Sequence, residues 1–390
     1  MRIVLTGGGT GGHIMPFESI VEALRATYKQ ELSSLPSFLE PEHLEIYFFG
    51  VTTPASDELF KKYSVPVRHI PSGKMRRYAS ALNILDILWF LPIGILIAII
   101  RMWQVMPDIV VSKGGYGSIP SVLAATLYRI PIILHESDAV PGAANSSLMR
   151  FASAITLGFA VSREYLQQWG YKLFVTGTPV RVLMNKQGKA DAKKTFGLPE
   201  SETILLVMGG SQGAQQINEA LLAILPTIIE KMAVIHITGE AGHDAVVKVA
   251  NEFIAKSSRK DLYKPFPYLA EKMSTALLAT DIAVSRAGAS SLSEIAHLRI
   301  PSVIIPLDSA ANDHQRKNAL AFEASGGALV LEPNNLSPHL LEQSVMRLFS
   351  DPSLKQTLSN NLAALDFPNS ALDIAKLTFQ LASGFRPKKK

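Results

Sequence analysis

The chain has no cysteine among its 390 residues, which excludes disulfides, thiolate metal ligands and cysteine nucleophiles. It also lacks the P-loop pattern G-x-x-x-x-G-K-[ST], the zinc-protease pattern H-E-x-x-H and any D-x-D pair that could hold a metal-bound diphosphate. No motif therefore requires a metal ion or other cofactor. Glycine, by contrast, is concentrated in loops that follow apolar runs, where backbone N–H groups can bind anions.

The chain has few charged residues and a small excess of basic ones. Only 18% of the residues are charged, 47% are hydrophobic, and the net charge is +5. This length and composition predict two well-buried globular domains. The positive balance suits an anionic substrate or lipid surface, and we expect no nucleic-acid partner because basic–aromatic interleaving and helix-turn-helix patterns are missing. The first apolar run is too short for a signal peptide.

Apolar runs and amphipathic stretches alternate along the chain. Runs at residues 3–6, 44–50, 109–112 and 132–135 predict buried parallel strands, with helices at 16–28 and 118–128. The pattern restarts with a strand at 203–208, a helix at 216–231 and strands at 233–238, 282–285 and 302–306. We therefore predict an α/β protein with two Rossmann-like domains facing a cleft, joined near residues 177–194. A last helix at 370–383 could pack on either domain.

Residues 87–100 form an uncharged run that contains two aromatic side chains. Fourteen residues fall short of the roughly twenty that cross a bilayer comfortably. Lys74, Arg76 and Arg77 precede the run and Trp103 follows it, an arrangement typical of a helix that docks on an anionic membrane surface. A buried core helix is the alternative.

The first glycine loop, Gly7-Gly-Gly-Thr-Gly-Gly12, follows a strand and precedes His13. The pattern G-x-G-x-x-G alone is weak evidence for a dinucleotide site, and the end of the second strand lacks the carboxylate that NAD binding needs. We interpret the loop as an anion site at a helix start, with a tight turn that binds nothing as the alternative. His13 is a candidate general base there.

Three segments of the second half repeat this chemistry. The loop 209–213 offers glycine N–H groups and the Ser211 hydroxyl to a phosphate. Segment 286–294 begins another helix, where Glu294 could accept hydrogen bonds from a ribose or, alternatively, cap the helix. The polar cluster 312–315 follows a strand, where open α/β sheets bind ligands, although an ordinary loop is the alternative. Arg181 could neutralise a diphosphate.

Together these motifs resemble the MurG family of UDP-N-acetylglucosamine transferases, which make lipid II. The resemblance covers nearly the whole chain and is carried, in order, by Thr6–His13, Lys113-Gly-Gly-Tyr-Gly-Ser118, His135-Glu136, Pro141-Gly142 with Asn145, Gly177-Thr-Pro-Val-Arg181, 209–214, 286–294 and His314-Gln315. It implies the GT-B glycosyltransferase architecture. An acceptor and membrane-docking domain would span 1–181, a UDP-sugar domain would span 182–366, and a final helix at about 367–386 would return to the first domain.

The resemblance also implies roles for individual residues. His13 and Glu136 would be catalytic, with His13 as the base for the acceptor's 4-hydroxyl, and Glu294 would bind the ribose. The substrate-binding set would be Thr10, Gly11, Gly12, Asp138, Asn145, Arg181, Ser211, Gln212, Ala289, Ser290, Ser291, Leu292, Ser293, Glu294, His314 and Gln315. The family's usual Gln-Asn after His-Glu is here Ser137-Asp138, which departs from the pattern at the sugar-contacting loop.

The implied donor is UDP-N-acetylglucosamine, and the implied acceptor is lipid I, undecaprenyl-pyrophosphoryl-N-acetylmuramyl-peptide. The implied location is the cytoplasmic face of the inner membrane, reached through residues 74–103, where other cell-wall synthesis proteins are compatible partners. Two alternatives stay open. One is another UDP-sugar enzyme of this fold, either a glycolipid glycosyltransferase or a UDP-N-acetylglucosamine 2-epimerase. The other is a non-catalytic nucleotide-binding scaffold.

Overall fold

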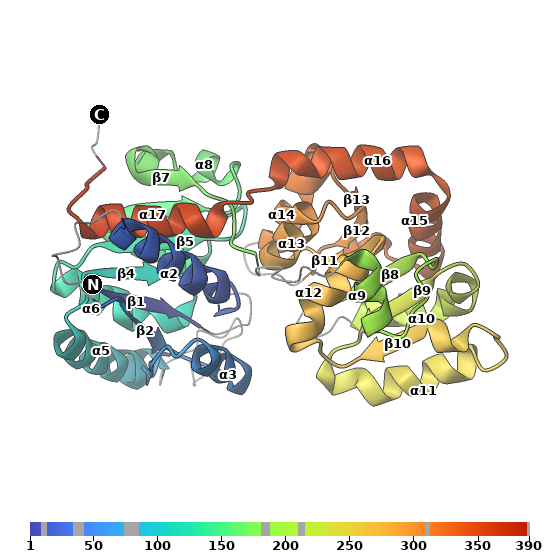
Figure 1. Cartoon of the computed structure of the whole chain (residues 1–390), viewed down its shortest axis with the longest axis horizontal. Coiled ribbons are helices and arrows are strands. Elements are labelled where there is room, and N and C mark those ends of the chain that lie inside the picture. The colour runs from blue at the N-terminus through green and yellow to red at the C-terminus, as the bar shows by residue number, and fades with distance from the viewer. Residues whose placement is uncertain are drawn as a thin grey trace. The chain divides into compact units, whose positions relative to one another are not determined.

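The computed structural model describes residues 1–8, 14–33, 43–73, 86–180, 188–209, 215–308 and 313–387. The chain divides into two compact units (Figure 1). Unit 1 contains Met1–Arg181 and Phe367–Lys390, and unit 2 contains Val182–Asp366. Each unit has a parallel sheet covered by helices, so both are Rossmann-like.

The sheet of unit 1 has seven parallel strands in the order β3-β2-β1-β4-β5-β6-β7. Their bounds are β1 (Arg2–Gly7), β2 (Glu45–Gly50), β3 (Val67–His69), β4 (Ile109–Ser112), β5 (Ile132–Glu136), β6 (Ala154–Leu157) and β7 (Leu173–Val175). The strand order reverses between β1 and β4, which are hydrogen-bonded neighbours. Ligands of such sheets bind beyond the carboxyl ends of the strands at this reversal.

Helices cover both faces of this sheet. They are α2 (Phe17–Ser33), α3 (Pro54–Lys62), α5 (Leu91–Val105), α6 (Ile119–Leu127), α7 (Ala143–Leu148), α8 (Ser162–Tyr165) and α17 (Ser370–Ala382). Ile3 and Leu5 of β1 point to a core shared with α2 and α17, while Val4 points to a core shared with α5 and α6. The alternation follows from the two-residue period of a strand. Tyr28 stacks on Phe379, so the last helix packs on α2 within unit 1.

Unit 2 repeats the same topology with six parallel strands in the order β10-β9-β8-β11-β12-β13. The strands are β8 (Ile204–Met208), β9 (Ala233–Ile237), β10 (Tyr263–Phe266), β11 (Ile282–Arg286), β12 (Ser302–Ile305) and β13 (Leu329–Val330). The helices are α9 (Lys189–Thr195), α10 (Gln215–Ile229), α11 (His243–Phe253), α12 (Met273–Ala279), α13 (Ala289–His297), α14 (His314–Ala324), α15 (Pro338–Ser350) and α16 (Pro352–Asn361). Its reversal lies between β8 and β11.

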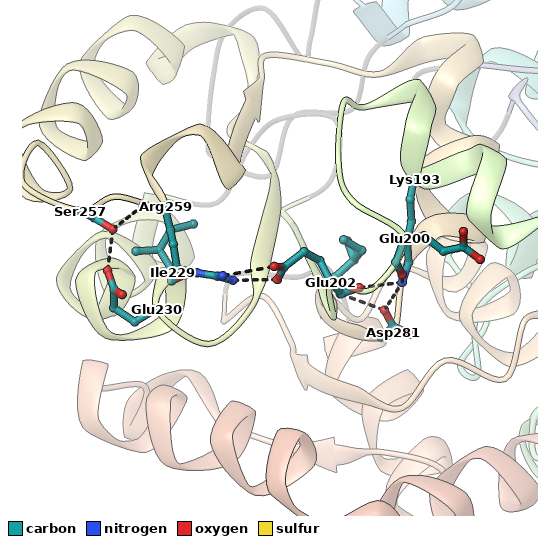
Figure 2. Close-up of polar contacts among 9 residues, drawn as sticks. Lys193, Glu200, Glu202, Ile229, Glu230, Ser257, Arg259 and Asp281 are labelled. Atoms are coloured by element: carbon teal, nitrogen blue, oxygen red, sulfur yellow. Dashed lines mark hydrogen bonds and ion pairs between the residues drawn. The ribbon is translucent and has the colours of Figure 1, made fainter.

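A polar network in unit 2 ties the start of β8 to its surroundings, as Figure 2 shows. Arg259 donates to both carboxylate oxygens of Glu202, at 3.2 and 2.7 Å, and to the carbonyl of Ile229 at 2.7 Å. Lys193, which is nearly buried, donates to the Glu202 carbonyl at 2.6 Å and pairs with Asp281 at 3.4 Å. The network therefore satisfies charged groups at the edge of the hydrophobic core.

The predicted strands all form, with ends that differ from the prediction by one residue at most. The helix at 118–128 is similarly close, whereas the first helix continues to Ser33, five residues beyond its predicted end. The shortest strands, β3, β7 and β13, were not predicted, and neither were β6 and β10.

The apolar run at 87–100 lies in a longer helical stretch, because Arg101 and Gln104 continue α5 to Val105. The stretch Leu88–Val105 is long and apolar enough to cross a membrane by length and composition alone, which corrects the prediction of a run too short to do so. Most of it is not buried. The buried residues are Gly94, Ala98, Met102 and Val105, and α5 packs along α6. It is therefore not a core helix.

The outer face of this stretch carries large apolar side chains with helical spacing. We call Trp89, Ile93, Leu96, Ile100 and Trp103 the α5 stripe. Trp103 is 65% exposed and Leu96 59%. Their spacing of three and four residues places all five on one face of a helix.

Candidate functional site

The candidate site of unit 1 lies at the carboxyl ends of β4 and β5, next to β1. The backbone N–H of Lys113, which follows β4, donates to the Thr6 carbonyl at the end of β1, at 2.9 Å. Glu136 ends β5, and the loop that follows it contains Ser137 and Asp138. The structure therefore places this loop beside the strand-order reversal, where ligands bind in open α/β sheets.

Glu136 organises this loop. One carboxylate oxygen accepts from the backbone N–H of Asp138 at 3.0 Å. The other accepts from the N–H of Gly142 at 3.0 Å and from the Asn145 amide at 2.8 Å. The three sequence-predicted residues Glu136, Asp138 and Asn145 thus lie together. Because these donors hold both oxygens in place, the geometry gives Glu136 an orienting role for the loop.

Electrostatics at Glu136 oppose ionisation. Burial, and then the charge of Asp138, raise the pKa of Glu136, while the hydrogen bonds from the loop lower it. The pKa is therefore raised overall, since burial removes more hydration than the donors replace.

Asn145 fits against a glycine. Its amide also donates to the His135 carbonyl at 3.2 Å. A Cβ at Gly114 would lie 2.3 Å from the Asn145 side-chain oxygen, and the φ of Gly114 is +80°. Residue 114 must therefore be glycine for Asn145 to reach Glu136. Within the described part of the chain, that oxygen has no hydrogen-bond partner and can accept a bond from a ligand.

Lys113 is the buried cation of this cluster. Its side chain is 1% exposed, and its ammonium donates to the Ser137 hydroxyl at 2.6 Å. Burial lowers the pKa of Lys113 to about 7, although the charges of Glu136 and Asp138 act in the opposite direction. Sequence reasoning named Lys113 within a motif but gave it no role.

The candidate site of unit 2 lies at the carboxyl ends of β11 and β12. Arg286 is nearly buried, burial lowers its pKa, and its guanidinium donates to the Pro306 carbonyl at 2.8 Å. Asn318 of α14 donates to the Ala287 carbonyl at 3.0 Å. The side-chain oxygen of Gln315 accepts from the Leu307 backbone N–H at 3.0 Å. These bonds join the two loops that lead into α13 and α14.

The predicted residues Ala289–Glu294 form the first six positions of α13, and His314 and Gln315 begin α14. Gly288, which has no side chain, is the N-cap of α13. Glu294 lies beyond the first turn of α13, which disfavours the capping interpretation. The two helix starts are suitable for anion binding, because their first N–H groups have no partner within the helix.

Part of the predicted set lies outside the described residues, namely Thr10, Gly11, Gly12, His13, Arg181, Ser211 and Gln212. The basic residues Lys74, Arg76 and Arg77 also lie outside them. Among the residues that are described, no group of three or more His, Asp or Glu side chains could hold a metal ion.

The N-terminal domain of glycosyltransferase family 28 matches residues 33–157, and the C-terminal domain of that family matches residues 204–377. A Lachnospira eligens protein named UDP-N-acetylglucosamine–N-acetylmuramyl-(pentapeptide) pyrophosphoryl-undecaprenol N-acetylglucosamine transferase is 34% identical over 90% of this chain and 91% of its own. The chain belongs to the MurG family of glycosyltransferase family 28.

Solved structures agree on the fold of this family 28 member. The crystal structure of Acinetobacter baumannii MurG has a TM-score of 0.68 at 24% identity, covering 97% of this chain and 99% of its own. A Listeria monocytogenes structure described as a putative UDP-N-acetylglucosamine 2-epimerase has a TM-score of 0.70 at 12% identity, covering 100% of this chain and 99% of its own. The two-domain GT-B architecture predicted from the sequence is thus confirmed.

Proposed function

We propose that this protein transfers N-acetylglucosamine from UDP-N-acetylglucosamine to the 4-hydroxyl of lipid I, forming lipid II in peptidoglycan synthesis. The observation that carries the proposal is the match to a transferase of this name over nine-tenths of both chains. The glycine loops, hydroxyls and helix starts at the carboxyl ends of both sheets support it, because both substrates carry diphosphates.

Unit 2 is the donor domain in this proposal. The starts of α13 and α14 direct N–H groups to the diphosphate of the leaving UDP, and Glu294 accepts from the ribose. Negative charge builds on the diphosphate as the glycosidic bond breaks, so fixed N–H dipoles stabilise the transition state more than the ground state. Arg181, Ser211, Gln212 and Gln315 complete the donor site, as the family resemblance implies.

Unit 1 is the acceptor domain. His13 takes the proton from the attacking 4-hydroxyl, a contribution of about 10²–10⁴-fold for general bases. A single displacement at the anomeric carbon inverts its configuration. The loop held by Glu136, together with Asn145, lines the acceptor side, and Thr10, Gly11 and Gly12 face a diphosphate.

The α5 stripe docks unit 1 on the cytoplasmic face of the inner membrane. Five large apolar side chains on one face are a costly surface in water, and tryptophan is favoured at membrane interfaces. Because the other face of α5 packs along α6, we place the helix on the membrane rather than across it. The basic residues Lys74, Arg76 and Arg77 favour anionic lipid.

The proposal is tested by incubating the purified protein with radiolabelled UDP-N-acetylglucosamine and lipid I, beside other labelled UDP-sugars. Label must enter a lipid product only with the N-acetylglucosamine donor. A change of the free donor to its C2 epimer, without lipid product, would favour the epimerase. In His13→Ala, transfer must fall while UDP binding is retained. Full turnover by this variant would show that His13 is not the base.

A further inference from the structure

A buried hydrogen-bond network lies between the sheet of unit 2 and helix α10. His236 is the fourth residue of β9. Its two ring nitrogens face the Tyr263 hydroxyl at 2.9 Å and the Asn218 side-chain oxygen at 3.0 Å. The amide nitrogen of Asn218 donates to the Thr238 carbonyl at 2.9 Å. All three side chains are buried, and each of their polar atoms has a hydrogen-bond partner, so the network is complete.

The donor and the acceptor of each bond follow from the carbonyl at one end of the network. A carbonyl only accepts, so the Asn218 amide nitrogen faces Thr238 and the amide oxygen faces His236. That oxygen requires a proton on Nε2 of His236. Burial lowers the pKa of His236 to about 3, so the imidazole is neutral at neutral pH. Nδ1 then carries no proton and accepts from the Tyr263 hydroxyl.

The network joins three segments at the carboxyl edge of this sheet. Asn218 is the fourth residue of α10, the helix that follows the glycine loop 209–213 in the sequence. Thr238 follows β9, and its backbone N–H donates at 3.0 Å to the carbonyl of Phe266, the last residue of β10. Because the Asn218 amide bonds both to a side chain of β9 and to the backbone beyond it, the amide fixes the first turn of α10 against the strand.

Apolar packing alone would hold α10 on the sheet. Ile217 and Leu221 of α10 lie in the same buried cluster as Val234 of β9. The hydrophobic effect is not directional, however, whereas hydrogen bonds restrict both distance and angle. Polar side chains in such a core therefore add little to stability but can define one position of the helix.

We propose that Asn218 and His236 are positioning residues that hold the start of α10, and with it the preceding loop 209–213, where the diphosphate of the sugar nucleotide binds. The inference rests on the proposed function, which assigns Ser211 and Gln212 of this loop to the donor site. It extends that function by naming the buried residues on which the geometry of the loop depends. A displacement of about 1 Å at such a site can be costly even when it begins far from the substrate.

The test measures UDP affinity by titration calorimetry and the KM for each substrate in the transfer assay. Asn218→Leu should weaken UDP binding and raise the donor KM about tenfold, equivalent to about 1.4 kcal/mol, while the KM for lipid I changes little. Tyr263→Phe removes only the far end of the network and should have a smaller effect. Equal changes in both KM values, or an unchanged UDP affinity in Asn218→Leu, would overturn the inference.

Urea unfolding separates positioning from support of the fold. Asn218→Leu leaves the buried N–H of His236 without an acceptor, so this variant should be less stable. The triple variant Asn218→Leu, His236→Leu, Tyr263→Phe removes the remaining polar groups and should regain part of the stability, while its UDP affinity stays low. A UDP affinity that returns together with stability would show that the three residues only support the fold.

Thr280→Val is the matched control. Its buried hydroxyl donates to the Ala276 carbonyl at 2.6 Å, and the residue lies just before β11, at the opposite edge of the same sheet. The variant should lose stability and keep its UDP affinity. If it weakens UDP binding as much as Asn218→Leu does, the effect is general destabilisation and the inference is wrong.

The hydrogen-bond assignment has a readout that needs no substrate. In protein labelled with 15N-histidine, NMR should place the His236 proton on Nε2 at neutral pH, and a proton on Nδ1 would overturn the assignment. A wild type that binds UDP but transfers no sugar would refute the proposed function, while the affinity comparison would still decide the positioning role. A wild type that binds no UDP would overturn both.

Discussion

Replacing Leu96 in the middle of the α5 stripe tests membrane docking with little risk to folding. The side chain is 59% exposed and lies on the face of α5 opposite the residues that pack inward. Leu96→Gln therefore leaves the contact with α6 unchanged. Any loss of vesicle binding can then be assigned to the outer surface.

The expected size follows from the exposed fraction. Burying a whole leucine side chain yields about 1.5–3 kcal/mol, so the exposed part of Leu96 contributes about 1–2 kcal/mol on entering the interface. This range corresponds to a loss of about five- to thirtyfold in the partition coefficient. The same change at Trp103, which is 65% exposed, should cost at least as much, because tryptophan is larger.

The assay is co-sedimentation with vesicles that contain phosphatidylglycerol, beside vesicles of phosphatidylcholine alone. Wild-type binding should be stronger to the anionic vesicles and should weaken as salt increases. Phe253→Gln is the matched control, because Phe253 is 51% exposed on α11 of unit 2. If Leu96→Gln and Trp103→Gln bind like the wild type, or if Phe253→Gln loses as much as they do, the stripe is not the docking surface.

Three further predictions concern stability. Burial lowers the pKa of His236 from 6.5 to about 3. The neutral imidazole therefore contributes its full share to the free energy of unfolding above pH 6.5, and this contribution is lost as the pH falls toward 3. Between pH 7 and 5 the wild type should lose about 2 kcal/mol more unfolding free energy than His236→Gln in urea titrations, and parallel losses would contradict this. Arg259→Met should destabilise by about 1–3 kcal/mol, and adding Glu202→Gln should recover part of that cost in the same titration; strictly additive losses would argue against coupling. Gly94→Ala should lower the melting temperature, because its Cβ would lie 1.9 Å from the Pro71 carbonyl oxygen, whereas a rise would mean that helix propensity prevails.

Most of the strands that the sequence predicts well are buried along nearly their whole length. Ile109–Ser112 is an unbroken apolar run because helices cover both faces of a parallel strand, so burial is visible as composition. Val67–His69 and Leu329–Val330 are too short and too exposed to stand out. Their extended backbone depends on pairing with a neighbouring strand, which is a tertiary contact.

The ends of α5 illustrate a second limit. Arg101 interrupts the apolar run in sequence, but its long side chain reaches solvent from a half-buried position while the helix continues. The charged residue therefore ends the apolar run in the sequence, whereas the helix continues to Val105.

The glycine loops and helix starts could be predicted because their chemistry is local. The contact between Lys113 and Ser137 could not, because it joins residues that are 24 positions apart at the ends of adjacent strands. Only the register of β4 beside β5 brings them together. A lysine directly after a buried strand was the available signal, since a cation there must find partners inside the protein.

The return of α17 to α2 has a consequence for biosynthesis. Unit 1 contains residues on both sides of unit 2 in the sequence, so α2 lacks one of its packing partners until α17 is made, after unit 2. At about 5–20 residues per second, the ribosome needs on the order of ten seconds or more to synthesise the intervening unit. During that time Tyr28 and its neighbours lack their cover, so the nascent amino-terminal unit is exposed to chaperones and aggregation while the second unit can already fold.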